Sequence, residues 1–216
     1  LINGTRKLQE EQAVAQRKRS VDYDKVLKRQ RAMMYEVRNR LLDGGSLEPE
    51  TVKQLAYEGV EGFLKEHPHP ATGDVTRYVL NNIAYNLDNR FLNIDHMKGR
   101  VVKKTLRKVL ISYVNTAWKN KERSFSSEEE LREYIRLCSL RAIDDAWVEQ
   151  VDYLQQLQYV VSGRATAQRN PVFEYHEEAY DSFVRMEKTI KREIVRNIFL
   201  GDKKYSKTGE LFVLFP

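Results

Sequence analysis

The 216-residue sequence has few of the residues that mark disulfides, turns or membrane spans. It contains one cysteine, five prolines and ten glycines. A single cysteine cannot form an internal disulfide, so a disulfide-stapled fold is excluded. No apolar run approaches the roughly 18 residues that a membrane span needs, and no signal peptide opens the sequence. Cys138 itself lies on an apolar stripe and is predicted to be a core residue rather than a reactive thiol.

Motifs of catalysis are also lacking. The sequence has no glycine-rich phosphate loop, no Gly-x-Ser-x-Gly and no His-Glu-x-x-His. Its four histidines lack the spacing of a metal site: His67, His69, His96 and His176. We therefore expect no catalytic residue, no metal and no cofactor in this chain. An unrecognised enzyme stays open as an alternative, and it would need a deep polar pocket with perturbed ionisable groups.

The net charge of +6 is concentrated at the front of the chain. Residues 1–42 hold eleven Lys and Arg against five Asp and Glu, whereas residues 128–216 hold thirteen against sixteen. This basic excess leaves open a helical adaptor module that binds an acidic protein partner or nucleic acid. Interleaved acidic residues are more typical of a solvated helix face, so no nucleic-acid partner is expected.

Apolar residues recur every three or four positions in the long windows of the sequence, which predicts an all-α fold. Two stripes, on either side of a linker over 162–171, predict an antiparallel helical hairpin over 131–198. In the linker, Gly163 is available to end the first helix in a left-handed conformation, and Asn170 with Pro171 is a helix start. The stripes are Ile143, Trp147, Val151, Leu154, Leu157 and Val161, and then Tyr175, Ala179, Phe183, Met186, Ile190, Ile194 and Ile198.

Residues 6–42 lack glycine and proline and predict one long helix, which the glycines at 43–46 end. Its apolar seam has heptad spacing, as in a helix that lies along partners. Gln30 interrupts the seam, and we expect it to fix the register or to bond a neighbouring chain. The seam consists of Tyr23, Leu27, Gln30, Met34, Val37 and Leu41.

The middle of the chain predicts helices over 47–64, 74–91 and 105–121. Ser126 or Ser127 can cap the helix that follows. The tail ends in the apolar run 211–215, which predicts a short strand or extended segment packed on another part of the protein.

Two motifs in this order resemble the SecA preprotein translocase family. The first lies in the long helix and matches the family at Tyr23, Asp24, Val26, Gln30, Arg31, Tyr35 and Arg38. The second lies in the predicted hairpin and matches at Asp144, Trp147, Glu149, Ala167, Gln168, Pro171, Glu174, Tyr175 and Phe183.

The resemblance implies a domain order. Residues 1–42 correspond to a long scaffold helix, 43–127 to a helical wing, 128–200 to a two-helix finger and 201–216 to an extended tail. In the family, the scaffold helix braces the motor folds and the preprotein-binding domain. The finger enters the cytoplasmic mouth of the SecY channel, where its tip contacts the moving polypeptide.

The resemblance also implies roles for individual residues. The finger tip, expected to contact substrate or channel, carries Arg164, Thr166, Gln168 and Arg169. Contacts of the scaffold helix with the motor domains are expected at Tyr23, Asp24, Gln30, Arg31, Tyr35 and Arg38. Packing within the finger is expected at Trp147, Glu149, Pro171, Tyr175 and Phe183.

Departures from the family pattern favour an accessory SecA paralogue of Gram-positive bacteria, which exports a few surface glycoproteins. Lys25 replaces an acidic residue, Gln150 replaces a histidine, and Thr166 stands where housekeeping members usually carry a tyrosine. The sequence also lacks the cysteine-rich zinc tail of many housekeeping members.

By this resemblance the chain is a non-catalytic module of an ATP-driven translocase subunit. Leu1 in place of an initiator methionine indicates a piece of a longer protein. We expect ATP and Mg²⁺ to bind motor domains outside this piece. The expected partners are a SecY-type channel, a secreted preprotein, the rest of the SecA motor and accessory secretion proteins. The expected location is cytoplasmic, at the periphery of the cytoplasmic membrane.

Overall fold

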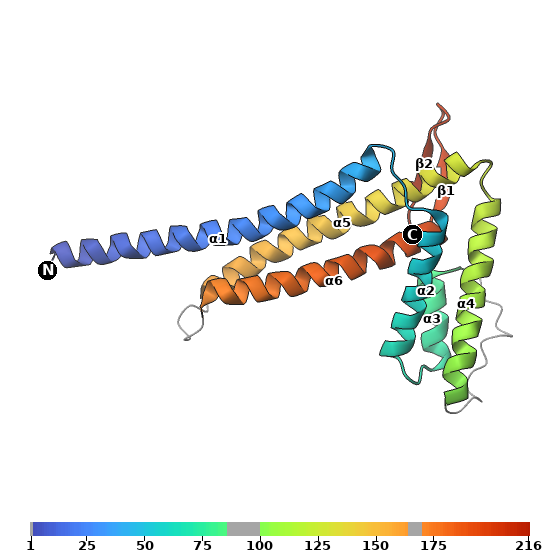
Figure 1. Ribbon diagram of the computed structural model, residues 1–216, viewed down its shortest axis with the longest axis horizontal. Helices are drawn as coiled ribbons and strands as arrows, with labels where there is room; N and C mark the ends of the chain where they lie inside the picture. Colours follow the sequence, from blue (N-terminus) through green and yellow to red (C-terminus); the bar gives the residue numbers. More distant parts are fainter. Residues whose placement is uncertain (1, 86–99, 164–169) are drawn as a thin grey trace. The chain divides into compact units, whose positions relative to one another are not determined.

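A computed structural model describes residues 2–85, 100–163 and 170–216, with side chains placed over 10–85, 103–163 and 170–216. The described residues form an all-α fold with one small antiparallel sheet, which confirms the predicted fold class (Figure 1). In chain order the elements are α1 (Ile2–Leu42), α2 (Pro49–Glu66), α3 (Thr72–Asn82), α4 (Arg100–Arg123), α5 (Glu128–Gly163), α6 (Pro171–Leu200), β1 (Asp202–Tyr205) and β2 (Leu211–Leu214).

The chain divides into two compact units. Unit 1 consists of Leu1–Arg40 and Asp144–Lys188, and unit 2 of Leu41–Ile143 and Thr189–Pro216. Helices α5 and α6 therefore contribute to both units. The assignment of separate wing and scaffold domains stays a prediction.

The hairpin predicted over 131–198 is confirmed as α5 and α6, and every apolar residue of the second stripe is buried. Asn170 caps α6, because its Oδ1 accepts a hydrogen bond from the Val172 amide at 3.0 Å. Ser127 caps α5, because its Oγ accepts a hydrogen bond from the Glu130 amide at 3.2 Å. The left-handed end expected at Gly163 is wrong. That residue is still helical, and the positive φ of +91° lies at Gly44, just after α1.

One predicted helix ends earlier than expected. We predicted 74–91, but α3 ends at Asn82, and residues 83–85 are not helical. The Asn82 side-chain amide donates a 2.8 Å hydrogen bond to the Tyr78 carbonyl, and the amides of Ile83 and Ala84 both donate to the Val79 carbonyl. The side-chain bond to the Tyr78 carbonyl and the second amide on the Val79 carbonyl take the place of regular ladder bonds where the helix stops.

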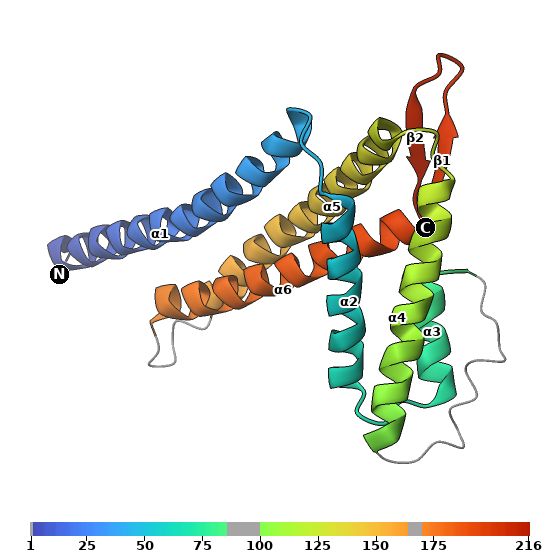
Figure 2. The ribbon, with the colours of Figure 1, turned by 45° about the vertical axis from the view of Figure 1, so that its right-hand side comes forward.

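The core of unit 2 packs α2 against α4, with α3 beside them (Figure 2). Across α2 and α4, the Tyr57 hydroxyl lies 2.5 Å from Asn115 Oδ1, and Arg107 pairs with Glu61. The buried apolar residues of these helices are Val52, Ala56, Val60, Phe63, Leu64, Val75, Val79, Leu106, Leu110, Val114 and Trp118.

Two side chains, the buried Tyr134 and the half-buried Lys121, hold the C-terminal end of α6. The carbonyl of Gly201 accepts hydrogen bonds from the Tyr134 hydroxyl and from the Lys121 ammonium, both at 2.7 Å. Burial lowers the pKa of Lys121 and raises the pKa of the Cys138 thiol to about 12. Cys138 is fully buried, as predicted for a core residue.

The tail is a hairpin of two strands rather than the single segment we expected. A turn closed by a 3.0 Å hydrogen bond from the Gly209 amide to the Ser206 carbonyl, with Gly209 at φ +85°, joins β1 and β2. The Lys203 ammonium and the Tyr205 hydroxyl both donate to the Glu130 carboxylate at the start of α5. Within β2, Val213 is buried, whereas Phe212 and Leu214 on either side of it are exposed.

Replacing Gly201 by alanine should destabilise the protein. A Cβ atom there would collide with the Asn197 carbonyl and lie 2.9 Å from the Tyr134 hydroxyl. We expect Gly201→Ala to lower the free energy of unfolding by about 2–4 kcal/mol, measured by urea denaturation. Gly62→Ala is the control, since no atom lies within 4 Å of its added Cβ. In the helix interior, this control should raise stability by up to about 1 kcal/mol. Equal effects of the two substitutions would contradict the role given to Gly201.

Candidate functional site

The candidate site is the junction where α1 lies along both helices of the hairpin within unit 1 (Figure 1). Tyr23 of α1 contacts Tyr175 of α6, while Arg38 of α1 contacts Asp144 of α5. Between these two contacts, Gln30 of α1 bonds Gln150 of α5 and the Ala179 carbonyl of α6. Later residues of α1 therefore contact earlier residues of α5 and later residues of α6. Helix α1 runs antiparallel to α5 and parallel to α6.

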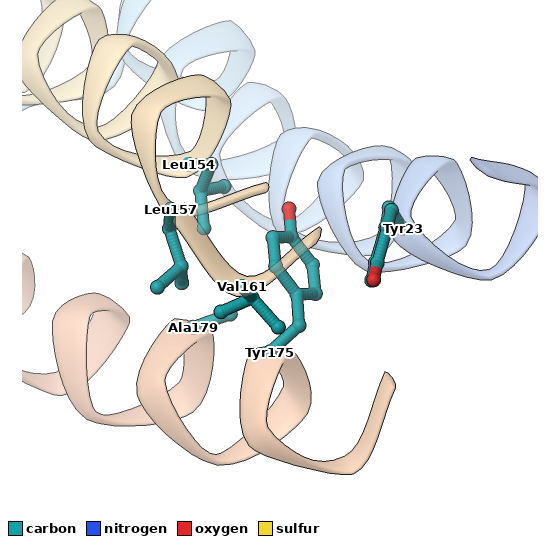
Figure 3. Packing of buried hydrophobic residues seen from close by; sticks show 6 residues of the cluster. All are labelled: Tyr23, Leu154, Leu157, Val161, Tyr175 and Ala179. Carbon is teal, nitrogen blue, oxygen red and sulfur yellow. The ribbon is translucent and has the colours of Figure 1, made fainter. Parts of the chain in front are cut away.

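An apolar cluster closes the junction near the linker of the hairpin (Figure 3). The rings of Tyr23 and Tyr175 lie with centroids 4.5 Å apart and planes tilted by 52°. Burial raises the pKa of Tyr175 to about 12, with the charge of Asp24 adding to the effect. All three helices contribute to this tyrosine cluster, whose buried members are Tyr23, Leu154, Leu157, Val161, Tyr175 and Ala179.

Next along α1, a closed ring of four hydrogen bonds joins the three helices. Gln150 donates to Gln30 Oε1 at 2.9 Å and to Ser182 Oγ at 2.8 Å. Gln30 and Ser182 in turn donate to the Ala179 carbonyl at 3.0 and 2.9 Å. We call these four residues the glutamine ring.

The ring is buried, which sets its energetic importance. Gln30 is 6% exposed, Gln150 is 5% and Ser182 is 5%. Losing one partner of a buried polar group costs about 1–3 kcal/mol. Any shift of α1 along the hairpin would break these bonds, so the ring fixes the register of the three helices. Gln30 was expected to fix the register or to bond a neighbouring chain, and its hydrogen bonds within this chain agree with the first alternative.

An ion pair completes the junction. Arg38 binds the Asp144 carboxylate through two nitrogens, with Nε 2.7 Å from Oδ1 and Nη2 3.2 Å from Oδ2. The two side chains are 34% and 46% exposed, so solvent screens the pair. The two parallel hydrogen bonds add geometric specificity to a modest energy.

The predicted seam is wrong at Val37, which is 44% exposed. Arg38, the next residue, is half-buried and turned toward α5. A straight α-helix has 3.6 residues per turn, whereas a heptad repeat assumes 3.5. Residues at strict heptad spacing therefore drift away from the line of contact with the partner helix. The step from Met34 is therefore four residues rather than three.

The residues expected to contact motor domains fall into two groups. Tyr23 and Gln30 are buried against α5 and α6, and Arg38 is paired with Asp144. The other three side chains are exposed: Asp24, Arg31 and Tyr35. Contact of the six with motor domains stays a prediction, and the exposed three have surface free for it.

The residues expected to pack within the finger also differ in burial. Tyr175 and Phe183 are buried, Trp147 and Pro171 are half-buried, and Glu149 is exposed. The four expected tip residues lie outside the described residues: Arg164, Thr166, Gln168 and Arg169. The aromatic residues that flank this stretch are exposed, Tyr159 at 84% and Phe173 at 62%.

This geometry holds three helices in one register. In the part of the chain that the structure describes, no group of three or more His, Cys, Asp and Glu side chains is placed to hold a metal ion. None of the described helices is long and apolar enough to span a bilayer.

Comparison with known proteins decides the family. Residues 1–201 match the family described as the SecA wing and scaffold domain. The chain belongs to the SecA family. SecA proteins similar to it include protein translocase subunit SecA 2 of Streptococcus agalactiae, 29% identical over 221 residues. The protein of the same name from Staphylococcus aureus (strain Newman) is 31% identical over 216 residues. Both matches cover all of this chain but only 26% and 27% of the relatives, so the chain spans about a quarter of their length.

The sequence analysis of this SecA chain missed two members of the glutamine ring. Gln150 was noted only as a departure from the family pattern, and Ser182 was not considered. A signal was present, because each is a polar residue at the helical spacing of an apolar stripe. Gln150 lies between Trp147 and Leu154, and Ser182 follows Ala179 by three positions.

Replacing Gln150 by leucine should destabilise unit 1. The change leaves Gln30 Oε1 and Ser182 Oγ without their buried donor. We expect a loss of about 1–3 kcal/mol in the free energy of unfolding, read from the denaturation of helical circular dichroism. Gln155→Leu, at an exposed position of the same helix, is the matched control and should change stability by less than about 0.5 kcal/mol. Equal losses of unfolding free energy in the two variants would show that the hydrogen bonds of the ring do not contribute to stability.

Replacing Tyr23 by phenylalanine should not destabilise the protein, unlike Gln150→Leu. Among the described side chains, the Tyr23 hydroxyl is the buried polar group that lacks a hydrogen-bond partner. Its removal should leave stability unchanged or raise it by up to about 1 kcal/mol. Tyr134→Phe is the contrast, because that hydroxyl donates to the Gly201 carbonyl, and we expect a loss of about 1–2 kcal/mol. Thermal unfolding of both variants checks the pair, and a clear loss in Tyr23→Phe would contradict the assignment.

Proposed function

We propose that this chain is a non-catalytic module of an ATP-driven preprotein translocase subunit. In this proposal α1 receives the movement of the motor domains, and the hairpin of α5 and α6 passes it to the polypeptide in a SecY-type channel. Membership in the SecA family supports the proposal. The architecture of unit 1 supports it as well. Helix α1 contacts the hairpin at three successive levels, through Tyr23, Gln30 and Arg38.

The observation that carries the proposal is the glutamine ring. A transmitting element must keep its parts in one register while force passes through it, and packed elements with discrete arrangements can do this. Apolar contacts are non-directional, whereas a hydrogen bond needs one geometry, so a fully satisfied buried polar network specifies one arrangement of the helices. The ring bonds α1 to both helices of the hairpin at one level.

The proposal extends to the branch, the partners and the location. The relatives that support the accessory branch carry the name SecA 2. The partners would be a SecY-type channel, a secreted preprotein of the surface glycoprotein class, the motor domains and accessory secretion proteins. The protein would then work in the cytoplasm, at the periphery of the cytoplasmic membrane.

ATP and Mg²⁺ would bind the motor domains of the complete subunit. This assignment rests on the family and on the sequence, which has no glycine-rich phosphate loop. The chain's own share of the mechanism is to position the hairpin. Its finger tip, with Thr166 at the centre of the linker, would contact the substrate.

A charge swap at the junction tests the coupling. In the complete translocase subunit, Arg38→Glu or Asp144→Lys alone would place like charges together and weaken the hold of α1 on α5. We expect each single change to lower preprotein translocation into membrane vesicles by about two- to fivefold, given pair energies of about 1 kcal/mol, while ATP turnover changes less. The double swap restores an ion pair and should recover most of the translocation.

The matched control swaps a local pair on the outer face of the same helix. Arg40→Glu with Glu36→Lys exchanges the exposed pair of α1 and should leave translocation unchanged. Single variants at Arg38 and Asp144 that translocate normally would contradict the coupling role. A double swap without recovery would contradict the pairing.

A further inference from the structure

A cavity of about 730 Å³ is lined by residues of unit 2 alone. It is formed where the end of α3, the second half of α4, the end of α6 and the start of the tail hairpin meet. Its volume is in the range of sites that bind small molecules or peptide segments. Apolar and aromatic side chains contribute to its walls: Ile83, Tyr85, Tyr113, Phe125, Phe199 and Leu200.

One edge of the small sheet borders this cavity. Three consecutive residues of β1 line it, Asp202, Lys203 and Lys204, and no residue of β2 does. The cavity therefore lies on the side of β1 that faces away from β2. In the described part of the chain, β1 pairs with β2 alone, so this side of β1 is an open strand edge.

The register of the hairpin shows which peptide groups face that edge. The Ser206 amide donates to the Glu210 carbonyl at 2.9 Å, which makes these residues a hydrogen-bonded pair. Hydrogen-bonded and non-hydrogen-bonded pairs alternate along an antiparallel ladder. The pairs Tyr205 with Leu211 and Lys203 with Val213 are then non-hydrogen-bonded. The amides and carbonyls of Lys203 and Tyr205 thus point outward, where an added strand would meet them.

The charge of the cavity is positive. Lys121, Lys203 and Lys204 line it against a single acidic residue, Asp202. Lys121 is bonded to the Gly201 carbonyl and Lys203 to the Glu130 carboxylate, whereas Lys204 is exposed. An occupant with carboxylates next to apolar side chains would complement both the lysines and the aromatic walls.

We propose that this groove binds an extended acidic polypeptide segment, which adds to β1 as a third strand. Backbone hydrogen bonds to the open edge would supply affinity, and the cavity would receive alternate side chains of the segment. A second polypeptide-binding site, apart from the tip of the hairpin, goes beyond the proposed function. It rests on residues of unit 2 alone.

A binding titration with the 216-residue chain tests the proposal. The probe is a fluorescein-labelled nine-residue peptide in which glutamate alternates with valine and phenylalanine, followed by fluorescence anisotropy. A second peptide has the same sequence with N-methyl groups on alternate amides, which removes the donors that a strand edge needs. We expect the first peptide to bind and the methylated one to bind at least about tenfold more weakly.

Two matched variants locate the site. Lys204→Glu reverses the exposed charge in the groove, whereas Lys207→Glu makes the same change in the turn, outside the cavity lining. Lys204→Glu should weaken binding by about three- to tenfold, and Lys207→Glu by less than about twofold. Circular dichroism confirms that both variants fold.

Several outcomes would overturn the proposal. These are no binding of the first peptide, equal binding of the methylated peptide, and equal effects of the two variants. Self-association of the chain that the peptide does not reverse would instead assign the edge to a second copy. None of these results depends on translocation, so failure here is distinct from failure of the charge-swap experiment.

Discussion

Two buried glutamines, Gln30 and Gln150, join the three helices of unit 1. Leaving a buried amide without a hydrogen-bond partner costs about 1–3 kcal/mol of folding free energy. This cost makes the register of the junction discrete. Gln150 finds both its partners only when α1 and α6 stand at one position along α5, because Gln30 comes from the first helix and Ser182 from the second. The tyrosine cluster and the ion pair between Arg38 and Asp144 then lie on either side of the ring, at the positions that this register dictates. Buried polar networks whose members are all satisfied rigidify a core and specify one arrangement of it.

In unit 2, hydrogen bonds to the Gly201 carbonyl fix where α6 ends. The last carbonyls of a helix have no partner within it. Here the Tyr134 hydroxyl and the Lys121 ammonium converge on the Gly201 carbonyl, and the glycine leaves room for them. The tail hairpin starts at the next residue, so the position of its open edge follows from this contact.

The sequence predicted what depends on local periodicity and capping. The stripes of α5 and α6, the Asn170 cap and the core position of Cys138 follow from spacing and residue type, and the structure confirms them. The prediction failed where distant residues decide. Arg38, rather than Val37, lies on the contact line of α1, and its partner Asp144 is more than a hundred positions away in the sequence. Ser182 could be found only by treating every polar residue at core spacing as a candidate. The open edge of β1 could not be predicted, since the apolar run 211–215 indicates a strand without indicating its partner.

A double-mutant cycle on Gln30 and Gln150 tests the central claim most directly. Gln30→Leu, Gln150→Leu and the double variant are unfolded in urea, and the coupling energy is the part of the double effect that the single effects do not account for. If the ring holds the three helices in register, the coupling should be about 1–2 kcal/mol, with the double variant less destabilised than the sum of the singles. Gln150 Nε2 lies 2.9 Å from Gln30 Oε1. Additive effects, with no coupling between these two side chains, would contradict the role given to the glutamine ring.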